Sequence, residues 1–262
     1  MDRIKNAKRV VVKIGSSTLT YQTGLINLRR LERFVHVLAD LKNSGKEIVV
    51  VSSGAVSAGS AKIGLHHYPM STEEKQAMAA VGQSELMRIY GELFASFGHT
   101  VAQVLITKDV VDDETLRHNA CNTFRTLLKM NCVPIVNEND SISIEGVNFG
   151  GNDTLSAYVA ILCNADILIN MSDVEGLFSA DPRVCADAKK IDVVDTLTDE
   201  ILSMAGGIGS SRGTGGMATK LRAASMVCAA DIPMIIVNGE NPDILYDIFD
   251  GKKVGTYFRW GQ

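Results

Sequence analysis

A glycine-rich run, Arg212–Ala224 ("RGTGGMATKLRAA"), places a lysine, Lys220, in the first turn of an expected helix. Such runs commonly bind phosphate, because backbone N–H groups at a helix N-terminus attract anions. The run is not a P-loop, since Thr219 stands where that motif needs a glycine before its lysine. A nominal match to the dinucleotide-binding fingerprint consists of Gly213, Gly215 and Ala218. That fingerprint requires a strand directly upstream, and the preceding "DEILSMAGGIGSSR" does not predict one. The alternative to phosphate contact is that the run is a glycine-rich surface loop.

Polar side chains also follow four apolar runs elsewhere in the chain. These clusters are Lys13 with Gly15-Ser16-Ser17, Ser52-Ser53-Gly54, Asn137-Glu138-Asn139-Asp140, and Ser172-Asp173. Each cluster alone is compatible with ordinary turn chemistry. Because ligands of parallel sheets bind beyond the carboxyl ends of the strands, the four together predict one crevice at that edge.

The elements that must position these residues alternate along the chain. Strands are predicted in runs rich in valine and isoleucine at 9–15, 47–54, 100–107, 132–140, 166–173 and 232–239. Helices are predicted at Leu28–Ser44, Thr72–Phe97, Asp113–Met130, Asp153–Asn164 and Met217–Ala230. This alternation predicts a doubly wound, parallel α/β sheet whose strands are buried on both faces. Residues 141–151 and 199–209 are interpreted as insertions.

Composition narrows the class of protein. The chain has 262 residues, 46% of them hydrophobic and 21% charged, which suits one large globular domain or two small ones. A formal net charge of −4 gives no basic surface for nucleic acid. The N-terminus predicts neither a signal peptide nor a membrane span. Five cysteines without a C-x-x-C pair indicate reduced thiols in the cytoplasm.

Six segments occur in the order typical of one family: "VVVKIGSS", "VVSSGAVSAG", "VPIVNEND", "FGGNDTLSA", "SDVEGLFSADPR" and "GTGGMATKLRAA". From about Val10 to Thr256 the chain resembles the glutamate 5-kinases, which have the amino acid kinase fold. The resemblance implies a single amino acid kinase domain over 1–262, an α/β three-layer sandwich with a mainly parallel central sheet. It also implies ATP-dependent phosphorylation of the γ-carboxylate of L-glutamate, the first step of proline biosynthesis. Mg²⁺ is expected with ATP, proline is a candidate inhibitor, and a homo-oligomer (dimer or tetramer) is expected.

The resemblance assigns roles to individual residues. Those expected to be catalytic are Lys13, Lys220 and Asp153, the last aligning the two lysines. ATP contacts are expected from Lys13, Gly15, Ser172, Asp173, Thr214, Gly215, Gly216, Met217, Ala218, Thr219 and Lys220. Glutamate contacts are expected from Ser53, Gly54, Asn137, Asp140 and Asn152, and no protein metal ligand is expected.

Elementary chemistry agrees with this assignment. The γ-carboxylate of glutamate has a pKa of about 4.3, so it is already a nucleophile at neutral pH and needs no general base. None of the five histidines lies in a motif, which suits that chemistry. Phosphoryl transfer instead needs positioning and charge neutralisation, which Lys13 and Lys220 can supply. A carboxylate between them, Asp153, reduces their repulsion and keeps both protonated.

The chain departs from the family at two places. Gly151 stands where members usually carry aspartate ("GDND"), which removes one carboxylate from the expected glutamate site, so Gly151→Asp is expected to tighten glutamate binding. The chain ends at "VGTYFRWGQ", so the C-terminal PUA domain of many members is expected to be absent. The alternatives are another acceptor on the same fold (acetylglutamate, aspartate, carbamate or UMP) and a non-catalytic nucleotide or amino-acid sensor. The acceptor motifs contain no arginine for a nucleotide phosphate, and a degenerate sensor would tend to lose a lysine or Asp153.

Overall fold

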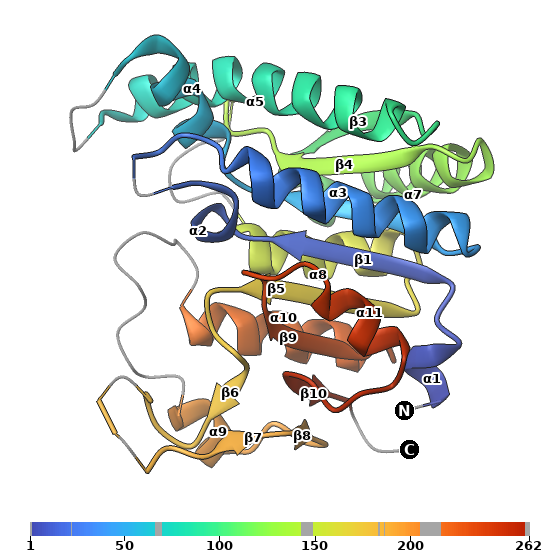
Figure 1. Ribbon diagram of the computed structural model, residues 1–262, viewed down its shortest axis with the longest axis vertical. Coiled ribbons are helices and arrows are strands. Elements are labelled where there is room, and N and C mark those ends of the chain that lie inside the picture. Colours follow the sequence, from blue (N-terminus) through green and yellow to red (C-terminus); the bar gives the residue numbers. More distant parts are fainter. Residues whose placement is uncertain are drawn as a thin grey trace.

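A computed structural model describes residues 2–21, 23–65, 70–142, 149–182, 184–185, 187–204 and 216–259. Strands form in all six predicted runs: β1 (Arg9–Ile14), β2 (Glu47–Ser52), β3 (Val101–Ile106), β4 (Val133–Glu138), β5 (Ile167–Ser172) and β9 (Met234–Asn238). They belong to one sheet with the order β3-β4-β2-β1-β5-β9-β10-β8 (Figure 1). The first six strands of this order are parallel, as predicted.

Short strands extend the sheet beyond the predicted runs. β10 (Thr256–Phe258) is antiparallel to β9, and β8 (Val193–Val194) is parallel to β10. A separate antiparallel pair joins β6 (Leu177–Phe178) to β7 (Lys190–Ile191). The sheet is therefore mainly parallel rather than wholly so.

The five predicted helices form with ends within two residues of the prediction: α3 (Leu28–Asn43), α5 (Thr72–Ala95), α7 (Glu114–Lys129), α8 (Asn152–Leu162) and α10 (Met217–Ala229). Side-chain caps explain where three of them begin. Asn27 accepts from the Arg30 amide, Asp113 accepts from the Leu116 amide, and Ser71 forms a capping box with Glu74. The remaining helices are α1 (Asp2–Lys5), α2 (Ser16–Leu19), α4 (Ala55–Ile63), α6 (Asp109–Asp112), α9 (Asp199–Met204) and α11 (Ile244–Phe249).

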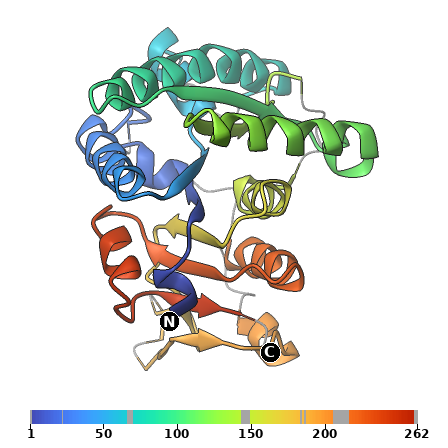
Figure 2. The ribbon, with the colours of Figure 1, turned by 90° about the vertical axis from the view of Figure 1, so that its right-hand side faces the viewer.

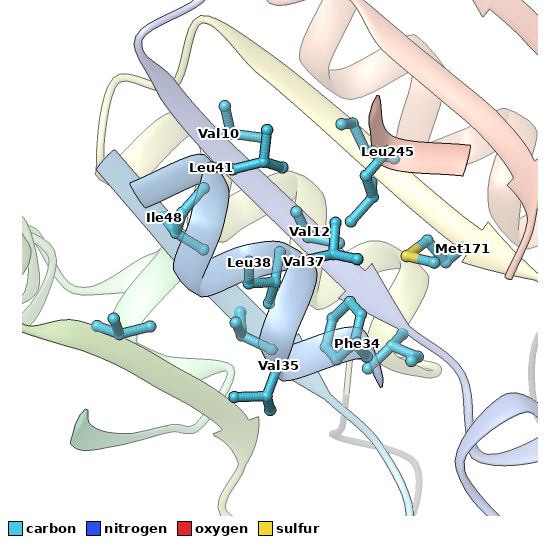
Figure 3. Packing of buried hydrophobic residues seen from close by; sticks show 14 of the residues in the cluster. Val10, Val12, Phe34, Val35, Val37, Leu38, Leu41, Ile48, Met171 and Leu245 are labelled. Carbon is cyan, nitrogen blue, oxygen red and sulfur yellow. The ribbon is translucent and has the colours of Figure 1, made fainter. Parts of the chain in front are cut away.

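Two apolar cores make the fold a three-layer sandwich. One core packs α3, α4, α5 and α11 against one face of the sheet, and the other packs α7, α8 and α10 against the opposite face. Figure 2 shows α3 and α11 on one side of the strands and α8 and α10 on the other. Residues of a strand alternate between the cores, so Val10 and Val12 of β1 join the α3 side while Val11 joins the α8 side. Figure 3 shows Phe34, Val35, Val37, Leu38 and Leu41 of α3 beside Val10, Val12 and Ile48 of the strands.

One expectation about burial is wrong. The run at 100–107 is as rich in valine and leucine as the other runs, but β3 is the edge strand, and its residues before Ile106 are half-buried or exposed. Leu105 keeps 38% of its surface exposed. A run of apolar residues therefore predicts a strand here without predicting its place in the sheet.

A close contact between two helices fixes the position of α5. A Cβ at Gly59 of α4 would lie 1.9 Å from the Met78 carbonyl oxygen, and one at Gly82 of α5 would lie 1.8 Å from the Ala55 carbonyl oxygen. Only glycine lets the two backbones approach this closely. The contact holds α5 against the start of α4, directly after the polar end of β2. Among the described residues, no helix combines the length and the apolar character needed to cross a membrane.

Candidate active site

The predicted polar clusters meet at the carboxyl edge of the sheet. Figure 1 shows β1 and β5 ending on the same side of the sheet, and the register sets Lys13 of β1 beside Asn170 of β5. The strand order reverses at β1, because β2 lies on one side of β1 and β5, which comes later in the sequence, lies on the other side. Such a switch point is where open α/β sheets bind ligands.

Two buried lysines share one buried carboxylate at the centre of this edge. Lys13 Nζ lies 2.6 Å from Asp153 Oδ1, and Lys220 Nζ lies 3.1 Å from Asp153 Oδ2. Their side chains are 8%, 5% and 1% exposed for Lys13, Lys220 and Asp153. Three separate elements supply them: Lys13 is the penultimate residue of β1, Asp153 is the second residue of α8, and Lys220 lies in the first turn of α10. The structure thus forms the predicted lysine–aspartate–lysine arrangement.

The electrostatics of this cluster depend on all three groups. Burial alone would raise the pKa of Asp153, but the charges of Lys13 and Lys220 hold it well below its usual value. Burial lowers the pKa of Lys13, the charge of Lys220 lowers it further, and Asp153 opposes both effects. Asp153 therefore acts as the counter-ion that favours the charged form of Lys13.

Two neutral side chains also bind Asp153. Thr219 Oγ1 lies 2.8 Å from Asp153 Oδ2 and also 2.8 Å from the Gly216 carbonyl oxygen. Asn170 Nδ2 donates to Asp153 Oδ1 over 2.9 Å. The sequence prediction placed Thr219 on the phosphates and missed Asn170 entirely. An asparagine inside the apolar run "DILINMSD" was the signal for it, because a polar residue inside a central strand needs a partner.

An amide network occupies the other half of the edge. Asn152 Nδ2 lies 2.9 Å from each of three acceptors: the Ser52 carbonyl oxygen, Ser53 Oγ and Asn137 Oδ1. Asn137 Nδ2 in turn donates to Gln83 Oε1 of α5 over 3.0 Å. The structure brings together Ser53, Asn137 and Asn152 as predicted, and it adds Gln83, which is 8% exposed and which the sequence prediction missed.

A pocket of about 380 Å³ opens beside this network. It lies between α5 and the ends of β3 and β4, and Gln83, Asn137 and Asp140 are among the residues that line it. Asp140 is half-buried, and burial together with the charge of Glu138 raises its pKa to about 6. The pocket therefore carries a carboxylate that is mostly ionised at neutral pH.

Gly151 has a backbone that other residues rarely adopt. Its φ is +116° and its ψ is 163°, in a region occupied almost exclusively by glycine. It is the residue before α8, so it directs Asn152 and Asp153 into the site. This conformation argues against the expectation that aspartate at this position would simply restore a missing contact.

The remaining predicted residues lie at the ends of strands or at the starts of helices, or they lie outside the described residues. Gly15 directly follows β1, Ser172 is the last residue of β5, and Asp173 follows it and is exposed. Gly54, with φ +97°, precedes α4. Gly216 caps α10, and Met217 and Ala218 form its first turn, Ala218 exposed. Thr214 and Gly215 lie outside the described residues. No strand lies in the described part of the segment before them, where α9 ends at Met204.

The sequence profile of the Amino acid kinase family matches residues 8–238. The chain is 52% identical to a "Glutamate 5-kinase" of Clostridium perfringens, with 97% of this chain and 96% of the relative covered. It is 45% identical to a "Glutamate 5-kinase" of Enterococcus faecalis, with 98% and 96% covered.

Solved structures give the same fold at low identity. An isopentenyl phosphate kinase of T. acidophilum superposes with a TM-score of 0.67 at 18% identity, covering 96% of this chain and all of that one. A UMP kinase of Bacillus anthracis superposes with a TM-score of 0.64 at 18% identity, covering 97% and 96%. These likenesses establish the fold alone. The length and identity of the sequence matches establish more: the chain belongs to the amino acid kinase family, in its glutamate 5-kinase group.

Proposed function

We propose that this protein transfers the γ-phosphoryl group of ATP to the γ-carboxylate of L-glutamate, which gives ADP and L-glutamyl 5-phosphate. A carboxylate oxygen attacks the γ-phosphorus, and the bond from that phosphorus to the bridging oxygen of ADP breaks. The observation that carries the proposal is the buried pair of lysines on Asp153, at the switch point of the sheet. The group of relatives to which the chain belongs supplies the acceptor.

Lys13 and Lys220 are the proposed electrostatic catalysts. In phosphoryl transfer, negative charge spreads over the equatorial oxygens and the leaving oxygen, and little covalent work is left to the protein. Two ammonium groups held in a buried site stabilise this charge without reorganising at the moment of reaction. Asp153 is the proposed organiser, because its two oxygens bind one lysine each. No base is required, since the attacking carboxylate is ionised.

The rest of the proposed ATP site surrounds these lysines. It comprises the backbone at Gly15, the ends of β5 at Ser172 and Asp173, and the segment from Thr214 to Lys220. Among the described residues, no group of three or more His, Cys, Asp or Glu side chains is arranged to hold a metal. Mg²⁺ keeps several waters and binds largely through substrate phosphates, so this donor set is compatible with Mg²⁺ that enters with ATP. When bound, Mg²⁺ would neutralise charge on the β- and γ-phosphates.

The amide network and the pocket form the proposed glutamate site. Asp140 is the proposed partner of the substrate ammonium, because it is ionisable, half-buried and beside the pocket. Ser53, the backbone of Gly54 and the amide of Asn152 are proposed to contact the substrate carboxylates. Asn137 holds Asn152 in place through the 2.9 Å contact between their amides. Proline, which shares an α-carboxylate and an amino group with glutamate, is proposed to compete here.

We also propose that the protein assembles into a homo-oligomer and that it is located in the cytoplasm.

The test is ADP release with a panel of acceptors: glutamate, aspartate, N-acetylglutamate, carbamate and UMP. Hydroxylamine, which traps an acyl phosphate as its hydroxamate, identifies the carboxylate product. The proposal expects glutamate to turn over with hydroxamate formation and UMP not to turn over. A preference for UMP, or ATP binding without turnover of any acceptor, would overturn it. Proline should raise the KM for glutamate when titrated at subsaturating glutamate, and an unchanged rate would exclude proline as a competitor.

A further inference from the structure

Asn170 is a buried polar residue with an unusual position. It lies in the middle of β5, between β1 and β9, and it has no exposed surface. On β9 its register partner is the apolar Ile236, and on β1 it is Lys13. Its Oδ1 has no hydrogen-bond partner among the described residues. Burying a polar atom without a partner destabilises a fold, so packing does not explain this side chain.

In the part of the chain that the structure describes, the side chain of Asn170 makes one hydrogen bond, and it goes to the Asp153 carboxylate. Asn170 Nδ2 donates to Asp153 Oδ1 over 2.9 Å, and that oxygen also binds Lys13. The orientation of the amide is fixed by its partner, because an ionised carboxylate only accepts hydrogen bonds. With Asp153 Oδ1 bound by Asn170 from the strand side, Asp153 Oδ2 is left for Lys220 and Thr219.

We propose that Asn170 is a positioning residue for phosphoryl transfer, whose amide holds the Asp153 carboxylate in the orientation that presents Lys13 and Lys220 to the transferred phosphoryl group. The role rests on the proposed function. Asn170 acts through Asp153, so it should affect kcat and not the affinity for either substrate. Its removal should not harm the core, because an apolar side chain at the same place would leave no unpartnered oxygen.

The first test replaces the amide by an apolar side chain of similar size. Asn170→Leu should lower kcat about tenfold or more, with KM for ATP and for glutamate within about twofold of wild type, and with unchanged or increased thermal stability. Met171→Leu, at a buried neighbour whose side chain faces the opposite core, is the matched control and should keep kcat within about twofold. An Asn170→Leu enzyme with more than about half of the wild-type kcat would overturn the proposal.

The second test makes the donor titratable. In Asn170→Asp, a protonated carboxyl can donate to Asp153 Oδ1, whereas an ionised one only repels it. The charged groups around this position are Asp153 of α8, Lys13 of β1, Lys220 of α10 and, near Lys13, Asp173. The kcat of Asn170→Asp relative to wild type should therefore rise at least threefold from pH 8.5 to pH 6. A ratio that does not change with pH would contradict a donor role for Asn170. This test decides the question even if Asn170→Leu does not fold.

A readout without substrate separates this proposal from the proposed function. Because the pKa of the new carboxyl should be raised in the folded state, the melting temperature of Asn170→Asp relative to wild type should be higher at pH 6 than at pH 8.5. A wild-type protein that releases no ADP with glutamate would refute the proposed function, and this melting comparison would still decide whether Asn170 serves as donor to Asp153. If the melting temperatures of Asn170→Asp and wild type differ by the same amount at both pH values, the donor role of Asn170 is rejected.

Discussion

The two halves of the carboxyl edge are built from different chemistry. The half around Asp153 holds two lysines and a carboxylate, all at most 8% exposed, in direct ionic contact. The half around Asn152 holds neutral amides and hydroxyls, joined by hydrogen bonds of 2.9–3.0 Å, beside an open pocket. Asn152 and Asp153 are adjacent in the sequence, so the first turn of α8 separates the two environments.

The difference matches what each half has to recognise. Charge that develops in a transition state is stabilised best by fixed charges in a site that excludes water. A small amino acid that must enter and leave is selected by directional hydrogen bonds and one charge at the right place. We therefore expect changes in the ionic half to affect stability and kcat, and changes in the amide half to affect the KM for glutamate.

The largest expected effect follows from removing the shared counter-ion. Asp153→Asn leaves two buried lysines without a carboxylate, and breaking a buried ionic network in this way costs about 3–5 kcal/mol of unfolding free energy. The pKa of Lys13 should then fall further, so the unfolded state binds more protons than the folded state at neutral pH. The stability deficit relative to wild type should consequently shrink as the pH rises from 7 to 9.5. Urea unfolding at both pH values measures this.

Asp195→Asn is the control for that experiment. Asp195 pairs with Arg259 over 2.8 Å, but both side chains are more than half exposed. Exposed pairs contribute little, so this variant should lose far less stability than Asp153→Asn. Comparable losses in the two variants would show that the buried cluster is no more than a surface-like ion pair.

The second effect concerns the glycine that introduces α8. Gly151→Asp forces a side chain into a glycine-only backbone region, which costs about 1–3 kcal/mol of unfolding free energy. The KM for glutamate should not decrease, because the strained backbone displaces Asn152. Gly150→Asn is the matched control, since the φ of Gly150, +73°, lies in the left-handed region that asparagine tolerates. Tighter glutamate binding by a stable Gly151→Asp protein would instead support the restored contact that the family comparison suggests.

A smaller effect is expected from the titration of Asp140. Its pKa of about 6 means that the carboxylate is ionised above pH 6 and becomes neutral below it. If it binds the substrate ammonium, kcat/KM for glutamate should fall about tenfold between pH 7 and pH 5, a loss of about 1.4 kcal/mol. Asp140→Asn should have a low kcat/KM that no longer changes over this range. A wild-type profile that is flat from pH 7 to pH 5 would remove Asp140 from ammonium recognition.

Much of the fold was predictable because local signals and long-range packing agree. The six strand runs and five helical periodicities are continuous in the sequence, and parallel sheets need just such apolar strands. The place of β3 at the edge was not predictable, because its composition matches that of buried strands. The sequence did not predict α4, because "AVSAGSAKI" is rich in small residues. These residues allow the close contact with α5, which the sequence does not reveal.

The candidate site divides in the same way. The positions of Lys13, Asp153 and Lys220 follow from motifs, and their meeting follows from the topology of the sheet. The contacts of Asn170 and Gln83 depend on which strands and helices become neighbours, and no motif specifies that. The backbone conformation of Gly151 was also invisible, because the sequence records only that a side chain is missing.

The division between the two halves is tested most directly by steady-state kinetics on one variant from each. Lys220→Met keeps the apolar stem and removes the charge, and Ser53→Ala removes one hydroxyl from the amide half. Lys220→Met should lower kcat about a hundredfold or more, with a smaller change in the KM for ATP. Ser53→Ala should raise the KM for glutamate several-fold with kcat nearly unchanged. A folded Lys220→Met enzyme with more than about a tenth of the wild-type kcat, a loss below about 1.4 kcal/mol, would contradict a catalytic role for the ionic half.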